Sequence, residues 1–343
     1  MYMKNTSYLI NKRVLFPSES FTEIDKNNLF LGSLKKKYYK DNNNKLHYGV
    51  ILLKKGKFSI IDCLKCKFIH AVPFLEKSNI KNFYEKKFYN QNRKKDYFKH
   101  QKKDLDWWNK IFEERLSKFH KILKKKGTIL DVGCGPGFFL NFAKKRGWKV
   151  NGIEPSIDAV NYGKKKLGIK INHGDFSLLK KFKNVDIVYT HGVLEHLEDP
   201  INFVKQAEKC LSKKGLIFTS VANDFNQIQF LALNHVKKPW WITPPEHYNY
   251  FNMTSIKRLM NRKFKIKDIS VSFPIDIFIL MGQNYINRKT LGKKIHNMRV
   301  LLESNLDLKG SFNLKKKIFK GFVNQKIGRQ IDLICQKKNY KNK

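Results

Sequence analysis

The chain has 343 residues, a formal net charge of +42 at pH 7 and five cysteines. This length suits two domains, or one large domain with additions. Cysteines that are few and odd in number argue against a disulfide framework and for a reducing compartment. The first residues lack the apolar core of a signal peptide, and no uncharged apolar run reaches the roughly 18 residues of a membrane-spanning helix. We therefore expect a soluble, cytoplasmic protein.

The positive charge has two explanations. An excess of 70 Lys and Arg over 28 Asp and Glu suggests an anionic partner such as nucleic acid, a membrane surface or a phosphorylated substrate. Lysine is, however, spread along the whole chain, together with Asn, Ile, Phe and Tyr, which all have A/T-rich codons. We therefore favour a solvated lysine surface that follows from genome composition over a specific polyanion site.

The N-terminal part of the chain shows one short β pattern. Residues 1 to about 60 are polar and are expected to be irregular, with a loop at 40–45. Residues 57–74 alternate and are rich in β-forming side chains around Cys63 and Cys66, which predicts a small hairpin with a turn between these cysteines.

A helical segment is predicted next, from about 76 to 126. Between 105 and 123, apolar side chains recur at steps of three and four residues, which is typical of an amphipathic helix. This stripe consists of Leu105, Trp108, Ile111, Phe112, Leu116, Phe119, Ile122 and Leu123.

Strands and helices alternate from residue 128 onward. Predicted strands lie at 128–133, 149–155, 170–176, 185–192 and 215–223, with helices at 138–147, 156–167 and 201–211 between them. Asp199 and Pro200 suit the start of the last of these helices. Such alternation indicates βαβ units and a parallel sheet with helices on both faces. Two further strands are predicted at 264–273 and 329–338, and the basic stretch between them, 284–328, is expected to be mainly helical and to cover the active site.

Three glycines follow the first strand in "TILDVGCGPGFF" (128–139). Ligands of a parallel sheet bind beyond the carboxyl ends of its strands, and glycine lets the backbone turn sharply and approach a ligand closely. A dinucleotide site usually has the spacing G-x-G-x-x-G. Here Gly133, Gly135 and Gly137 alternate, and Phe138 occupies the place of the third glycine of that pattern.

Acidic residues end three successive strands. Glu154 is placed to accept hydrogen bonds from both hydroxyls of a ribose, and Asp175 from an exocyclic amine, with Phe176 beside the face of the base. Asp131 lies near whatever the glycine turn holds. The ligand predicted by this arrangement contains adenosine and carries positive charge in place of a pyrophosphate.

The segments "LDVGCGPG", "GIEPS", "HGDF" and "VYTHGVLEHLEDP" resemble the successive motifs of class I S-adenosylmethionine-dependent methyltransferases, over roughly residues 120–260. The resemblance implies an α/β fold with a Rossmann-like, seven-stranded, mostly parallel sheet and a reversed final hairpin, preceded here by a small β-hairpin and helical extension. It implies S-adenosyl-L-methionine as cofactor. By the same resemblance, the cofactor-binding residues are Asp131, Gly133, Gly135 and Gly137 on the methionine side, Glu154 on the ribose, Asp175 and Phe176 on the adenine, and His191 near the donor sulfur.

Two Glu-His pairs compete for the catalytic role. Glu195 and His196 belong to the general pattern after the fourth strand, so we expect a structural or cofactor-supporting role, with His196 kept as a catalytic candidate. Glu246 and His247 follow the fifth strand, among aromatic residues. Their segment resembles one in sugar C-methyltransferases and in a bacterial family linked to surface-glycan pathways, which implies His247 as general base and Glu246 as its orienter or a hydroxyl contact. The alternative is a structural loop with packed aromatic side chains.

The segment around Cys63 and Cys66 resembles half of the zinc ribbon that precedes the methyltransferase domain in those families. An upstream Cys-x-x-Cys is absent. His47 and His70 could complete a set of four ligands, but their spacing does not demand it, and we expect a degenerate ribbon without metal. The aromatic-rich linker that follows contains Tyr84 and Tyr89, which are expected to reach the cofactor or the acceptor.

The predicted organisation is a ribbon-like region at 1–75, a helical linker at 76–126 and a methyltransferase domain at 127–343 with a helical insertion at about 284–328. The expected acceptor is a small molecule: a sugar, a nucleotide-linked sugar or a lipid-linked glycan precursor. A phosphorylated acceptor would suit the lysine excess. RNA methylation is the alternative that the charge supports, although no RNA-binding module is recognisable. A non-catalytic scaffold is the third hypothesis. Oxygen, carbon and nitrogen acceptors, and the oligomeric state, stay open at this stage.

Overall fold

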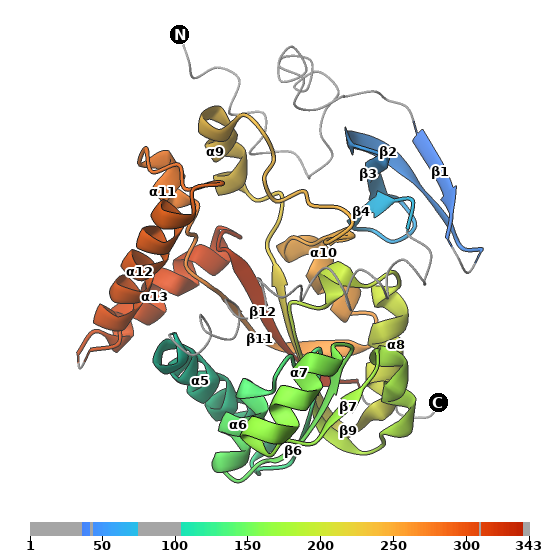
Figure 1. Ribbon diagram of the computed structural model, residues 1–343, viewed down its shortest axis with the longest axis vertical. Helices are drawn as coiled ribbons and strands as arrows, with labels where there is room; N and C mark the ends of the chain where they lie inside the picture. Colours follow the sequence, from blue (N-terminus) through green and yellow to red (C-terminus); the bar gives the residue numbers. More distant parts are fainter. Residues whose placement is uncertain (1–35, 42–43, 75–103, 309, 339–343) are drawn as a thin grey trace.

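The computed structural model describes residues 36–41, 44–74, 104–308 and 310–338, and these residues contain two β-sheets (Figure 1). The larger sheet has seven strands in the order β11-β12-β9-β8-β5-β6-β7. Its strands are β5 (Thr128–Val132), β6 (Lys149–Glu154), β7 (Ile171–His173), β8 (Val185–His191), β9 (Leu211–Ala222), β11 (Phe264–Val271) and β12 (Gln330–Lys337). Strands β5 to β9 pair in parallel, and β12 is antiparallel to both β9 and β11. The predicted class I methyltransferase topology is confirmed.

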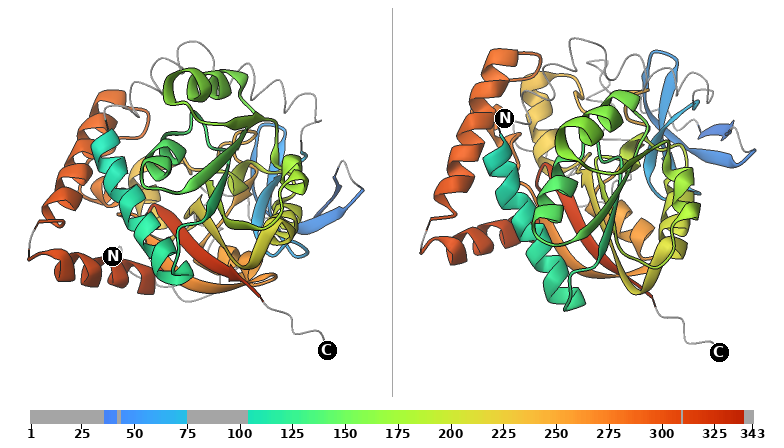
Figure 2. Two further views of the ribbon diagram at one scale, coloured as in Figure 1. Left: turned by 90° about the horizontal axis from the view of Figure 1, so that it is seen from below. Right: turned by 60° about the horizontal axis from the view of Figure 1, so that its bottom comes forward.

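Helices cover both faces of this sheet (Figure 2). They are α5 (Leu105–Leu123), α6 (Phe138–Lys145), α7 (Ile157–Tyr162), α8 (Pro200–Cys210), α9 (Gln227–Val236), α10 (Met253–Met260), α11 (Ile277–Leu280), α12 (Lys289–Asn305) and α13 (Phe312–Asn324). Shorter turns are the π-helix η2 (Gly163–Leu167) and the 3-10 helices η3 (Phe176–Lys181) and η4 (Leu194–His196). Asp199 caps α8 by accepting a hydrogen bond from the amide of Asn202 at 2.9 Å, with Pro200 in the first turn, as the sequence predicts.

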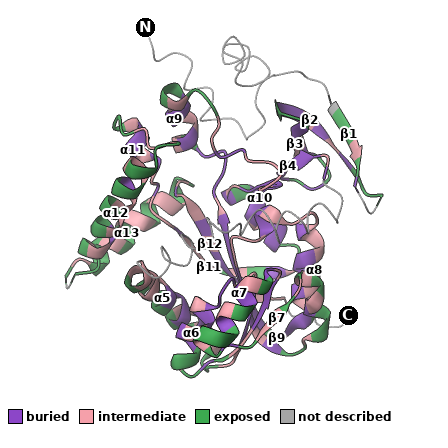
Figure 3. Ribbon diagram, viewed as in Figure 1, coloured by how far each residue is buried: buried purple, intermediate pink, exposed green. Residues whose placement is uncertain are grey.

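The central strands are buried on both sides (Figure 3). Successive side chains of a strand point to opposite faces, so Ile129 packs in the core under α5 and α6, whereas Leu130 packs in the core under α8 and α10. Ile187 and Val188 of β8 divide in the same way. This double burial explains why these strands read as continuous apolar runs.

The smaller sheet is antiparallel and has the order β1-β2-β3-β4-β10. It consists of β1 (Lys36–Lys40), β2 (Leu46–Lys55), β3 (Phe58–Cys63), β4 (Ile69–Val72) and β10 (Asn249–Tyr250). The hairpin predicted at 57–74 is confirmed as β3 and β4. The expectation of irregular structure before residue 60 is wrong for β1 and β2. The lysines of β1 hid this strand in the sequence, because β1 is an edge strand, where charged side chains are common.

Two predicted helical regions can be compared with the structure. The stripe at 105–123 is confirmed as α5. Tyr84, Tyr89 and most of the linker predicted at 76–126 lie outside the described residues. The stretch 284–328 is mainly helical, and its α12 contacts α5 through a hydrogen bond of 2.8 Å from Trp107 Nε1 to Glu303. No described helix is both long and apolar enough to cross a membrane.

Candidate active site

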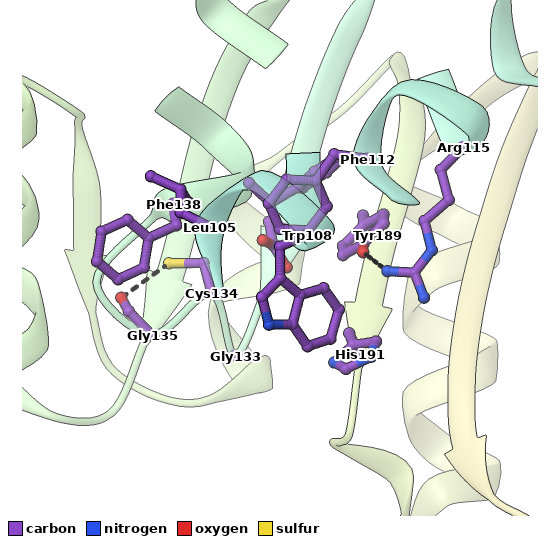
Figure 4. A pocket seen from close by; sticks show the side chains of 12 residues that line it. Leu105, Trp108, Phe112, Arg115, Gly133, Cys134, Gly135, Phe138, Tyr189 and His191 are labelled. Atoms are coloured by element: carbon purple, nitrogen blue, oxygen red, sulfur yellow. Dashed lines mark hydrogen bonds between the residues drawn. The ribbon is translucent and has the colours of Figure 1, made fainter. Parts of the chain in front are cut away.

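A cavity of about 290 Å³ lies at the carboxyl ends of β5 and β8, under helix α5 (Figure 4). The glycine turn after β5 forms its floor, β8 contributes one wall and aromatic side chains of α5 and α6 close it. The lining residues are Leu105, Trp108, Phe112, Arg115, Asp131, Gly133, Cys134, Gly135, Phe138, Phe139, Tyr189 and His191.

The glycine turn has the backbone that the sequence spacing predicts. Gly133, Gly135 and Gly137 have φ angles of 74°, 53° and 85°, a region that favours glycine. A Cβ on Gly133 would lie 2.6 Å from Val193 Cγ2, which is too close for a real contact. The turn therefore depends on glycine for its conformation and for its packing against the loop after β8.

Glu154 holds this turn from the end of β6. Its carboxylate accepts hydrogen bonds from the amides of Gly135 at 2.8 Å and Ser156 at 2.9 Å. Burial raises the pKa of Glu154 to about 7, and the two amide hydrogen bonds oppose that shift. The side chain is thus fixed against the glycine turn: it is not itself among the residues that line the cavity, but it holds the amide of Gly135, which is.

Asp131 is buried at the end of β5 and lines the cavity. Burial raises its pKa well above the usual range, the charge of Glu154 adds to this shift, and Arg115 opposes it. Two carboxylates at the ends of adjacent strands therefore lie in one poorly solvated region, where a cationic ligand would favour their ionised forms.

Arg115 is a cavity residue that the sequence interpretation missed. Its guanidinium donates to Asp332 from Nε at 3.1 Å and from Nη2 at 2.7 Å, and it also donates to the Tyr189 hydroxyl. The helical spacing offered a signal, because position 115 lies three residues after Phe112 and four before Phe119, on the buried face of α5.

His191 reaches the cavity from the end of β8 and meets the edge of Trp108, with ring centroids 5.6 Å apart. Among the described residues its Nε2 atom is buried without a hydrogen-bond partner. Burial lowers the pKa of His191 to about 4, and the charge of Arg115 lowers it further, so the ring is neutral at neutral pH. Trp108, which the sequence placed only in an apolar stripe, is thus also a site residue.

Asp175 and Phe176 are not among the residues that line the cavity. Asp175 is exposed and caps η3 by accepting a hydrogen bond from the Ser177 amide at 2.8 Å. Phe176 packs edge-on against Phe203 of α8, with centroids 5.7 Å apart. Their assignment to the adenine stays a prediction.

The two Glu-His pairs come together after β8 and before β10. His196 Nδ1 donates to the Glu246 carbonyl at 2.6 Å, and the Tyr248 amide donates to the Glu195 carbonyl at 2.8 Å. The rings of His196 and His247 lie edge to face with centroids 4.8 Å apart. The sequence treated these pairs as competitors, whereas the structure places them in one cluster.

His247 and His196, with the neighbouring Glu195 and Glu246, are called the histidine cluster below. The Nδ1 atom of His247 is buried without a hydrogen-bond partner among the described residues. Burial lowers the pKa of His247 to about 3, and the nearby charges of His196 and Arg329 lower it further. Glu246 contacts His196 through its backbone carbonyl.

Asp224, just after β9, is a further residue that the sequence interpretation missed. It is buried, and its amide donates to the Phe251 carbonyl at 2.7 Å. Burial raises the pKa of Asp224 to about 7, against the charge of Arg329. Its position at the carboxyl end of a central strand was the available signal.

The smaller sheet holds a third cluster of polar side chains. The structure brings His47, Cys63, Cys66 and His70 together, all four buried, with one nitrogen or sulfur atom of each within 4.8 Å of the others.

The chain is similar to several known methyltransferases. Residues 99–263 match a family model described as a methyltransferase domain. A ubiquinone biosynthesis O-methyltransferase of Pelagibacter ubique (strain HTCC1062) is 32% identical over 104 residues, which cover 29% of this chain and 43% of the relative. A protein of the same name from Rickettsia canadensis (strain McKiel) is 26% identical over 179 residues, 46% of this chain and 75% of the relative. The plantazolicin methyltransferase BpumL, solved in complex with SAH, is 17% identical with a TM-score of 0.44, over 76% of this chain and 94% of that one. Residues 99–263 are therefore similar to a methyltransferase domain.

Proposed function

We propose that the protein transfers the methyl group of S-adenosylmethionine to a hydroxyl group of a small molecule. The observation that carries this proposal is the buried pair Asp131 and Glu154 beside the glycine turn. Two buried carboxyl groups offer a pyrophosphate no positive partner, whereas they suit a ligand with a positive charge, which favours their ionised forms, and with ribose hydroxyls. S-adenosylmethionine has both features, and it supplies a reactive methyl group on a sulfonium.

In this proposal the cofactor occupies the cavity under α5. Asp131 and the turn of Gly133, Gly135 and Gly137 hold its methionine part, Glu154 its ribose, and His191 lies near the sulfur. Asp175 and Phe176 hold the adenine, an assignment that rests on the family resemblance alone. Trp108 and Arg115 are added to the site because they line the same cavity.

The acceptor is proposed to bind beside the histidine cluster. In the segments that contain these histidines, several buried polar atoms have no hydrogen-bond partner among the described residues: Glu195 Oε2, His247 Nδ1, Asn249 Oδ1, Trp240 Nε1 and Trp241 Nε1. Because buried polar groups are nearly always hydrogen-bonded in a working state, a polar acceptor would satisfy them. The aromatic side chains suit a ring, and a sugar or glycan precursor remains our preferred acceptor.

His247 is proposed as the general base. Since its ring is neutral, Nδ1 can accept the proton of the acceptor hydroxyl while the oxygen forms its bond to the methyl carbon and the carbon–sulfur bond breaks. His196 holds the loop before β10 by donating to the Glu246 carbonyl. The name of the two curated relatives, O-methyltransferase, favours oxygen as the methylated atom.

The test is transfer of a labelled methyl group from S-adenosylmethionine to a panel of nucleotide sugars, hydroxylated aromatic compounds and generic RNA. We expect label in a hydroxyl-bearing small molecule. Label in RNA alone would replace the proposal with its alternative, an RNA methyltransferase, and binding of the cofactor with no transfer to any class would favour a scaffold.

A further inference from the structure

The cluster of His47, Cys63, Cys66 and His70 is separate from the cavity and from the histidine cluster. His47 lies on β2, Cys63 ends β3, Cys66 lies in the following turn and His70 lies on β4. His47 Nδ1 is 3.2 Å from His70 Nε2, 3.3 Å from Cys66 Sγ and 4.0 Å from Cys63 Sγ. Three strands and one turn thus bring four buried donor atoms close together.

These distances are close to the edges of a tetrahedral metal site, with the one to Cys63 slightly longer. Zinc lies about 2.0 Å from imidazole nitrogen and about 2.3 Å from thiolate sulfur, so neighbouring ligand atoms of a tetrahedron are roughly 3.3 to 3.8 Å apart. Hydrogen bonding explains the cluster less well. With its Nε2 facing the Asp41 carboxylate, His47 has one lone pair on Nδ1, which cannot accept from a second imidazole and two thiols together.

The surroundings orient each donor toward the same point. The other nitrogen of His47, Nε2, lies 3.2 Å from a carboxylate oxygen of the buried Asp41. The other nitrogen of His70, Nδ1, lies 3.5 Å from the Ala71 carbonyl, and the Cys66 amide donates to Cys63 Sγ at 3.4 Å. Metal-bound histidines usually have such a carboxylate or carbonyl partner on the second ring nitrogen, which leaves the first nitrogen's lone pair free for the metal.

We propose that these four side chains bind a zinc ion, and that this ion fixes the strand on which the candidate acceptor site depends. Two thiolates and two imidazoles are a donor set typical of structural zinc, with no open position for chemistry. The ligand His70 lies opposite Asn249 in the pairing of β4 with β10, and the neighbouring Ala71 amide donates to the Tyr248 carbonyl at 2.7 Å. These bonds hold the residues that directly follow His247.

The metal itself is tested first, on the full chain purified without a metal-affinity tag. We expect about one zinc ion per chain by elemental analysis. Cys66→Ala should lose most of this zinc, whereas Cys210→Ala, which changes a buried cysteine of α8, should keep it. His47→Ala and the exposed His235→Ala form a matched histidine pair.

Titration of the metal-free wild-type chain with Co²⁺ needs no variant, so it tests the site even if the variants do not fold. The site predicts a thiolate charge-transfer band and the intense d–d bands of tetrahedral Co²⁺. A wild-type chain that neither contains zinc nor gives these bands overturns the proposal, as does zinc that survives both Cys66→Ala and His47→Ala.

The effect on the acceptor site is measured by amide hydrogen exchange before and after removal of zinc by a chelator. We expect faster exchange at 58–74 and 244–251 and no change at 128–132 in the larger sheet. Unchanged exchange at 244–251 after zinc removal would contradict the role of the ion in fixing β10. None of these three measurements uses cofactor or acceptor, so their outcomes are independent of the proposed methyl transfer.

Discussion

Glu154 is the residue proposed to bind the ribose, and its carboxylate also holds the glycine turn by accepting hydrogen bonds from the amides of Gly135 and Ser156. Hydrogen bonds to a charged group contribute about 1.5 to 3 kcal/mol. We therefore expect Glu154→Gln to weaken S-adenosylmethionine binding roughly ten- to one-hundred-fold, as measured by calorimetry. The control is Asp106→Asn, at an exposed position of α5, and equal affinity of both variants would remove Glu154 from the site.

His247 should matter for turnover and not for cofactor binding. A general base contributes about 100- to 10,000-fold to a rate, so His247→Ala is expected to lower methyl transfer by this factor at unchanged affinity for S-adenosylmethionine. His235→Ala, on the exposed side of α9, should keep full turnover. Turnover of His247→Ala that matches this control would show that the loop is structural, which is the alternative weighed from the sequence.

The lowered pKa of His247 also predicts a dependence of stability on pH. An unfolded histidine binds a proton below about pH 6.5, whereas the folded ring stays neutral down to about pH 3. Between these values the unfolded state binds more protons, so the free energy of unfolding falls as the pH falls. We expect His247→Gln to lose less stability than the wild-type chain between pH 7 and pH 4 in chemical denaturation, and identical slopes would contradict the burial of this ring.

A buried cation on helix α5, Arg115, links this helix to the sheet. Arg115 reaches Asp332 on β12 and Tyr189 on β8, and removing one partner of a buried ion pair typically costs about 3 to 5 kcal/mol. Arg115→Ala should therefore lower the free energy of unfolding by about this amount. Arg146→Ala breaks an ion pair with Glu113 that is far more exposed and should cost about 1 kcal/mol or less. Similar losses in both variants would mean that Arg115 does not anchor α5.

At the scale of elements, local patterns predicted most of the fold. The strands β5 to β9 and their helices were predictable because buried parallel strands and capped helices carry strong local signals, such as Asp199 and Pro200 before α8. Strand β1 was missed because its lysines, which suit an edge strand, resemble those of a loop. The two final strands were predicted as strands, and their reversed pairing followed only from the family resemblance.

At the scale of the whole molecule, the sequence could not show which distant side chains meet. The glycine turn and its carboxylates follow consecutive strands, so their meeting was predictable from a parallel sheet. Arg115 and Trp108 enter the cavity from a helix that precedes the sheet in the chain. His47 and His70 meet only because β2, β3 and β4 form one sheet, and strand β10 then links that sheet to the loop of His247.

The central claim is that the cavity under α5 binds an adenosyl sulfonium. Isothermal titration calorimetry of the purified chain with S-adenosylmethionine, and separately with a nicotinamide dinucleotide, tests it most directly. We predict saturable heat with S-adenosylmethionine at about one site per chain and none with the dinucleotide, whose pyrophosphate finds no positive partner in the two buried carboxyl groups. Binding of the dinucleotide without any heat from S-adenosylmethionine would contradict the account.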